Sequence, residues 1–157
     1  MTSVLFVCTG NQYRSPIAAE AFRGQLIRDG LIAQWRVASA GTWTSAGHHA
    51  PPDAVALARS FGINIEGHIT RMVDAKMLED ADLVFVMEQG HKESIQVEFP
   101  LARKKVYLLS QVMEGLVYDI PDPVGLRTEA ESIIRDLVDM IYAGYGNIYR
   151  LATMIQI

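Results

Sequence analysis

A short apolar run, a polar loop and a helical pattern follow one another at the start of the chain. Residues 4–7 are entirely apolar, which is typical of a strand covered on both faces. The run stops at Cys8, and apolar residues recur at helical spacing from Ile17 to Leu26. Strand, loop and helix in this order indicate a βα unit, which restricts the chain to an α/β fold.

The first helix has recognisable start and stop signals. Ser15 is expected at the N-cap, because its hydroxyl can accept a hydrogen bond from a backbone N–H of the first turn. Pro16 is expected at the first helical position, because the N–H that proline lacks would have no partner there. Asp29-Gly30 is expected to end the helix.

The alternation continues along the chain, with no linker or internal repeat among the 157 residues, so residues 1–157 are expected to form a single domain. Further strands are predicted around residues 35–39, 83–86 and 106–109, and further helices around 52–62 and 127–143. Thr128 and Glu131 form a predicted capping box for the last of these helices. Residues 145–157 fit either a short packed helix or a loosely held tail.

Charge and cysteine content exclude several classes of protein. The net charge of −4 provides no basic surface for nucleic acid, and a single cysteine cannot form an internal disulfide.

His48-His49 has no third ligand at metal-binding spacing, so no metal site is expected. The N-terminus does not resemble a signal peptide and no run of 18 apolar residues occurs, so we expect a soluble, cytoplasmic protein without membrane contact.

The loop after the first strand has the composition of an anion site. A loop between a buried strand and a helix N-terminus directs backbone N–H groups inward and adds the positive end of the helix dipole. The residues expected to bind phosphate are Thr9, Gly10, Asn11, Gln12, Tyr13, Arg14 and Ser15. The same cradle favours the thiolate of Cys8, whereas Arg14 can grip two phosphate oxygens with its planar guanidinium. A lone cysteine after a strand is more often only a small buried residue, but Arg-Ser at this offset favours a reactive one.

The segment from Val4 to Pro16 resembles the phosphate-binding signature of the low-molecular-weight protein-tyrosine phosphatases. The resemblance extends from residue 4 to about 143 through Ser39-Ala40-Gly41-Thr42, Pro51-Pro52-Asp53, Gly62-Ile63, His68, Arg71, Asp82 and Asp122-Pro123. It implies a four-stranded parallel sheet with helices on both faces and the phosphate loop after the first strand. It also implies hydrolysis of phosphotyrosine in protein substrates through a phosphocysteine at Cys8, without metal or other cofactor.

The resemblance also suggests which residues assist the reaction. Asp122, with proline on either side, matches the general acid of the family, and Asp119 is the competing carboxylate in the same loop. The Ser15 hydroxyl can donate to the Cys8 sulfur, while Asn11 and His68 resemble a pair that braces the loop.

Two positions depart from the family pattern. Tyr13 stands where many members have a second cysteine that protects the nucleophile, so no such disulfide can form here. Val124 stands where an aromatic residue is common, so Tyr13 or Trp43 is expected to form the pocket wall instead.

Two other functions fit the same loop. An arsenate reductase on this scaffold would need an external thiol, because the chain has no resolving cysteine. A phosphate-binding module without catalysis would need no acid such as Asp122. The sequence predicts neither the oligomeric state nor the physiological substrate.

Overall fold

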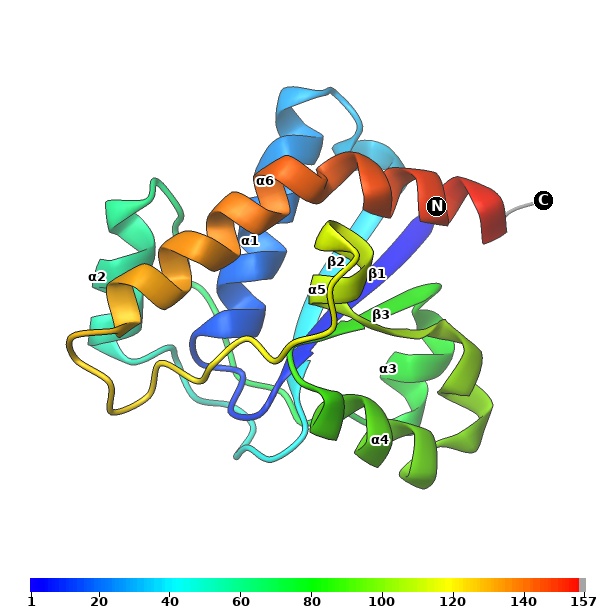
Figure 1. The fold of residues 1–157 in the computed structure, drawn as a ribbon, viewed down its shortest axis with the longest axis horizontal. Coiled ribbons are helices and arrows are strands. Elements are labelled where there is room, and N and C mark those ends of the chain that lie inside the picture. The colour runs from blue at the N-terminus through cyan, green and yellow to red at the C-terminus, as the bar shows by residue number, and fades with distance from the viewer. Residues whose placement is uncertain (156–157) are drawn as a thin grey trace.

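The computed structural model describes residues 1–155, and within them the strands form one parallel four-stranded sheet (Figure 1). The strands are β1 (Thr2–Cys8), β2 (Trp35–Gly41), β3 (Leu83–Val86) and β4 (Val106–Leu108), in the order β2-β1-β3-β4. Val4 of β1 lies opposite Val37 of β2 and Leu83 of β3. The predicted α/β class, with the loop after the first strand, is confirmed.

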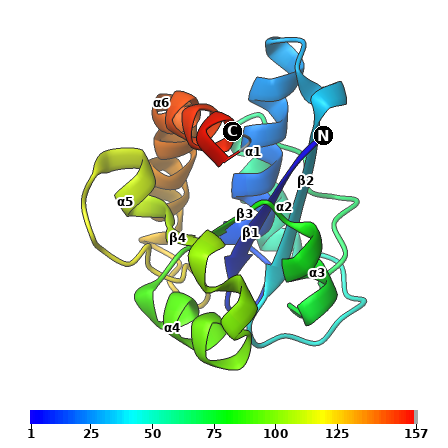
Figure 2. The ribbon, with the colours of Figure 1, turned by 90° about the vertical axis from the view of Figure 1, so that its right-hand side faces the viewer.

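Helices cover both faces of the sheet (Figure 2). One face packs against α1 (Arg14–Arg28), α2 (Pro52–Ser60), α5 (Leu109–Glu114) and α6 (Ala130–Ile155). The other packs against α3 (Ala75–Asp80) and α4 (Gln89–Glu98). Two 3₁₀ helices, η1 (Ile32–Gln34) and η2 (Pro100–Lys105), precede β2 and β4. None of the helices in residues 1–155 is long and apolar enough to cross a membrane.

Alternation of side chains along β1 divides the core into two layers. Phe6 points toward α1 and packs on Phe22 of that helix with 5.8 Å between ring centres. Leu5 and Val7 point to the other face, where they join Leu78 of α3. Because both faces are buried, an apolar residue is favoured at every central position, which accounts for the continuous run 4–7.

The observed boundaries of the first helix and the last strand differ from the predicted ones. Helix α1 begins at Arg14 with Tyr13 at the N-cap and no side-chain cap, so the prediction of Ser15 as N-cap is wrong. The Ser15 hydroxyl instead lies 3.0 Å from the Cys8 sulfur. The fourth strand ends at Leu108, because Leu109 already begins α5.

The last helix is longer than predicted. Helix α6 begins at Ala130, so Thr128 lies too early to cap it, and it continues through Gly144 and Gly146 instead of ending near 143. Gly144 lies against the side chain of Met113, since a Cβ there would lie 2.7 Å from the Met113 sulfur. Residues 145–155 are therefore helical, while 156–157 of the predicted tail lie outside the described residues.

The order of the strands determines where a site can form. From β1 the chain continues to β2 on one side of β1, and then crosses to β3 on the other side. The strand order therefore reverses direction between β1 and β3. In open parallel sheets a crevice forms at the carboxyl ends of the strands at this switch point. Cys8 ends β1 there and Met87 follows β3.

Replacing Ile148 by alanine tests whether the C-terminal half of α6 contributes to the core. Ile148 is completely buried, so Ile148→Ala should lower the free energy of unfolding by about 2–5 kcal/mol. Met154 is 69% exposed on the same helix, and Met154→Ala should change it little. Urea denaturation measures the free energy of unfolding of both variants. Equally small effects in the two variants would contradict the packing of Ile148 in the core.

Gly41 allows the end of β2 to lie against the loop that follows β1. The carbonyls of Cys8 and Thr9 accept hydrogen bonds from the N–H groups of Thr42 and Trp43. A Cβ on Gly41 would clash with the Thr9 carbonyl oxygen and lie 3.2 Å from the Asn11 Cβ. Only glycine permits this approach without a backbone shift.

Gly41→Ala should therefore destabilise the protein, by about 1–3 kcal/mol, because a backbone atom cannot move aside as a side chain can. Gly24→Ala is the matched control, since no atom lies within 4 Å of a Cβ at that helical position. Alanine there should stabilise the protein by up to about 1 kcal/mol through helix propensity. Denaturant midpoints that move in the same direction for both variants would refute the close approach.

Candidate functional site

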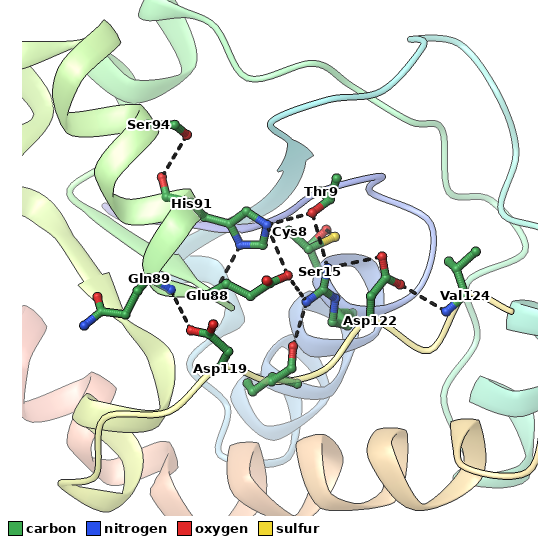
Figure 3. Close-up of polar contacts among 12 residues, drawn as sticks. Cys8, Thr9, Ser15, Glu88, Gln89, His91, Ser94, Asp119, Asp122 and Val124 are labelled. Atoms are coloured by element: carbon green, nitrogen blue, oxygen red, sulfur yellow. Dashed lines mark hydrogen bonds and ion pairs between the residues drawn. The ribbon is translucent and has the colours of Figure 1, made fainter. Parts of the chain in front are cut away.

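Residues 9–13 form a tight loop around the Cys8 sulfur, between β1 and α1 (Figure 3). The Cys8 side chain is buried at the base of the loop, and its sulfur accepts a hydrogen bond of 3.3 Å from the Asn11 backbone N–H. The Ser15 oxygen lies 3.0 Å from the same sulfur. Two hydrogen-bond donors are thus available to stabilise negative charge on this sulfur.

Asn11 braces the loop from behind. Its backbone is left-handed (φ 56°), and its side-chain amide donates to the hydroxyls of Ser15 at 2.8 Å and Ser39 at 3.0 Å. The amide oxygen accepts from the Arg71 backbone N–H at 2.9 Å. His68 Nε2 donates to the Asn11 carbonyl at 2.6 Å, and burial lowers the pKa of His68, so the ring stays neutral there. Asn11 and His68 are therefore in direct contact.

Arg14 lies beside the loop with its guanidinium almost completely buried. One terminal nitrogen, Nη1, donates to Glu88 Oε2 at 2.6 Å and to the Ile120 carbonyl at 2.7 Å. The other, Nη2, lies 3.4 Å from the Thr9 hydroxyl and 3.6 Å from Asp122 Oδ2. Arg14 is therefore held on one side, and its second terminal nitrogen lies at the edge of the loop.

Sequence reasoning missed Glu88 and His91, which lie at the start of α4. Each caps the other's backbone: the Glu88 carboxylate accepts from the His91 N–H, and His91 Nδ1 accepts from the Glu88 N–H at 3.1 Å. His91 Nε2 also lies 2.8 Å from the Thr9 hydroxyl. Polar residues directly after the strand next to β1 were the available signal, because the carboxyl ends of parallel strands meet at one edge.

The structure separates the two competing carboxylates. Asp119 accepts from the backbone N–H of Gln89 at 2.8 Å and so caps the start of α4. Asp122 lies on the side of Thr9 and Cys8 (Figure 3), where it accepts from the Val124 N–H at 3.1 Å and remains 44% exposed. Of the two, Asp122 has the carboxylate that faces the open side of the loop.

Two hollows flank the loop. One, of about 820 Å³, is lined by Thr9, Gly10, Gln12, Trp43, Thr44, Ser45, His48, Met72, Asp122 and Val124. The other, of about 600 Å³, includes Tyr13, Asp53, Leu57 and Pro123. The two expected wall residues therefore lie in different hollows, and Trp43 is highly exposed. Burial, followed by the carboxylates of Asp53 and Asp122, raises the pKa of Tyr13, so its phenol stays neutral.

The geometry suits covalent chemistry on a tetrahedral anion. The buried sulfur lies next to hydrogen-bond donors, a guanidinium is held at the edge of the loop, and a carboxylate stands at its mouth. His48 and His49 are exposed, and residues 1–155 contain no group of three potential metal-ligating side chains.

Comparison with known proteins matches the chain to one family. The model of the low molecular weight phosphotyrosine protein phosphatases covers residues 3–151. The tyrosine phosphatase Etp of Escherichia coli K12 is 36% identical over 121 residues, 77% of this chain and 76% of Etp. A protein-arginine-phosphatase of Bacillus subtilis is 34% identical over 146 residues, 88% of this chain and 95% of the relative.

A solved structure agrees. The tyrosine phosphatase Wzb of Escherichia coli K30, determined with sulphate, has a TM-score of 0.82 and 29% identity, over 93% of this chain and 97% of Wzb. With the family model matching nearly the whole length, the protein belongs to the low molecular weight phosphotyrosine protein phosphatases.

Proposed function

We propose that this protein hydrolyses phosphotyrosine in protein substrates through a phosphocysteine intermediate at Cys8. The observation that carries the proposal is the placement of the only cysteine beneath an N–H-lined loop, with Arg14 locked beside it. The family acts on phosphorylated proteins, and the related phosphatase Wzb binds sulphate, a tetrahedral dianion like phosphate.

In the first step the Cys8 thiolate attacks phosphorus and the bond to the tyrosine oxygen breaks. The loop N–H groups from Thr9 to Ser15 and the Arg14 guanidinium bind the three equatorial oxygens. Asp122, protonated, gives its proton to the departing phenolate, because its carboxyl group faces the open side of the loop.

In the second step water attacks the phosphocysteine and the phosphorus–sulfur bond breaks. Asp122 takes the proton from this water, and the Ser15 hydroxyl, 3.0 Å from the sulfur, stabilises the thiolate as it leaves. Asn11 and His68 hold the loop in shape through both steps. Nothing in this sequence of steps needs a metal ion.

Phosphoarginine is a second candidate substrate, favoured by two features. The Bacillus subtilis relative is a protein-arginine-phosphatase, and carboxylates of Asp122 and Asp53 lie near the loop. Carboxylates suit a cationic guanidinium as leaving group, and Val124 supplies no ring to stack on a tyrosine.

A panel of phosphopeptides decides between the substrates. The protein should release phosphate from a phosphotyrosine peptide in EDTA, and phosphoserine and phosphothreonine peptides should react far more slowly, because their alkoxides are poorer leaving groups. Turnover of a phosphoarginine peptide alone would replace phosphotyrosine by the second candidate. Binding without turnover of any peptide would refute hydrolysis altogether.

Cys8→Ser should abolish turnover but retain phosphate binding. The loop N–H groups and Arg14 survive the change, whereas a serine hydroxyl is rarely ionised and attacks poorly. We expect kcat to fall by at least about 100-fold, equivalent to roughly 2.7 kcal/mol in the barrier. Phosphate titration by calorimetry measures binding in the same variant. Residual turnover above that limit would remove Cys8 from the role of nucleophile.

Asp122→Asn should slow phosphoryl transfer from phenols with high pKa by about 100-fold or more, because an amide has no proton to give the phenolate. The transfer rate for activated substrates such as nitrophenyl phosphate should fall less. In the variant, the burst rate should therefore depend more steeply on the pKa of the leaving group than in the wild type. Single-turnover measurements isolate this first step from hydrolysis of the phosphocysteine.

Asp119→Asn is the matched control for the acid. Its oxygen caps Gln89, so the variant should keep the wild-type dependence on the leaving group even if it loses some stability. The reverse pattern, with the steeper dependence in Asp119→Asn only, would assign the acid to Asp119.

A further inference from the structure

His91 lies behind the phosphate loop and has no role in the reaction described above. It belongs to the first turn of α4, and its side chain is only 7% exposed. Both ring nitrogens nevertheless have partners: Nδ1 lies 3.1 Å from the Glu88 backbone nitrogen, and Nε2 lies 2.8 Å from Thr9 Oγ1. A buried ring thus connects the start of α4 to the loop that holds Cys8.

The two contacts define which nitrogen carries the proton. A backbone N–H can only donate, so Nδ1 is the acceptor and the neutral ring has its hydrogen on Nε2. Burial is the largest influence and lowers the pKa of His91, and the charge of Arg14 acts in the same direction. The facing carboxylates, of Glu88, Asp119 and Asp122, oppose this shift without cancelling it. At neutral pH the ring is therefore uncharged and donates from Nε2 to Thr9.

The Thr9 hydroxyl is consequently restricted in direction. Its oxygen accepts from His91 Nε2 at 2.8 Å and from Arg14 Nη2 at 3.4 Å. A hydroxyl has two lone pairs and one hydrogen, so with both lone pairs engaged the hydrogen points away from His91 and Arg14. Thr9 lines the hollow at the mouth of the loop with Gly10 and Gln12, so this hollow is available to the hydroxyl hydrogen.

We propose that His91 is a positioning residue that directs the Thr9 hydroxyl toward the phosphoryl group bound in the loop. The inference rests on the proposed function, because the loop must be the phosphate site. It adds one side-chain donor to the backbone N–H groups and Arg14. His91 also caps the backbone of Glu88, whose carboxylate holds Arg14 at 2.6 Å.

Two substitutions of His91 separate positioning from a merely structural role. In His91→Asn the side-chain oxygen can replace Nδ1 as acceptor for the Glu88 N–H, but no group replaces Nε2 as donor to Thr9, which keeps only the longer contact with Arg14 Nη2. In His91→Gln the longer amide can place a nitrogen near the original Nε2, so the donor to Thr9 is restored while the cap is lost. The variant that keeps the cap, His91→Asn, should be the more stable of the two. The variant that keeps the donor to Thr9, His91→Gln, should bind phosphate more tightly.

Inorganic phosphate and vanadate are the probes, with phosphotyrosine turnover as a second readout. His91→Asn should lose less stability than His91→Gln, and it should raise the dissociation constant of both anions by about tenfold, because the Thr9 hydroxyl is no longer directed toward the anion. His91→Gln should regain most of this affinity but unfold at lower denaturant. An unchanged anion affinity in His91→Asn would overturn the proposal.

Thr9 provides a second test, because its single variants leave His91 unchanged. Thr9→Val removes the hydroxyl and should weaken both anions by the same factor as His91→Asn, and Thr9→Ser should restore affinity. In the double variant, His91→Asn should cause no further loss, because the two residues act through one hydrogen bond. Fully additive losses would contradict the proposed coupling.

The test also distinguishes this inference from the proposed function. If the wild-type protein binds phosphate but does not turn over any phosphopeptide, the proposed hydrolysis fails. The anion affinities of the two single variants and the double variant, which form a double-mutant cycle, still decide the role of His91. If turnover is normal and the cycle is additive, the proposed function stands and the inference about His91 fails.

Discussion

The conformation of Asn11 is the constraint on which the phosphate loop depends. A loop whose N–H groups converge on one point needs a left-handed residue, and Asn11 adopts that conformation while completely buried. Its side-chain amide and its backbone carbonyl are hydrogen bonded, to Ser15, Ser39, Arg71 and His68. Each buried polar group left unpaired would cost about 1–3 kcal/mol, so the surroundings hold Asn11 in place. The loop therefore has its shape before phosphate arrives.

The buried charge of Arg14 is likewise held in place by contacts within the protein. A buried guanidinium is costly unless it is paired, and Glu88 with the Ile120 carbonyl satisfies Nη1. Removing one partner of such a pair typically costs about 3–5 kcal/mol, because the other charge stays buried. The fixed guanidinium avoids part of the ordering cost when an anion binds, which is the advantage of a preorganised site over a flexible cation at the surface.

The sequence predicted what depends on neighbouring residues and missed what depends on long-range contacts. The strand at 83–86 was predicted correctly, because burial on both faces leaves a continuous apolar run. Ser15 was misassigned as an N-cap because a serine before a helix has the same local pattern whether its hydroxyl contacts backbone or the Cys8 sulfur. The last helix was predicted to end near residue 143, although α6 continues through Gly144, which lies against Met113. Glu88 pairs with a residue 74 positions away, which no local pattern reveals.

The position of Asp122 follows from its neighbours rather than from its own contacts. Asp119 caps Gln89 of α4, and the Ile120 N–H donates to the Met87 carbonyl at 2.9 Å. The Ile120 carbonyl accepts from Arg14, so the segment is fastened both to the end of β3 and to the phosphate loop. Asp122, two residues later, is thereby brought to the mouth of the loop while its carboxylate stays partly in solvent. A carboxyl group placed in this way can exchange protons with water, which the proposed role of Asp122, as proton donor in the first step and proton acceptor in the second, requires.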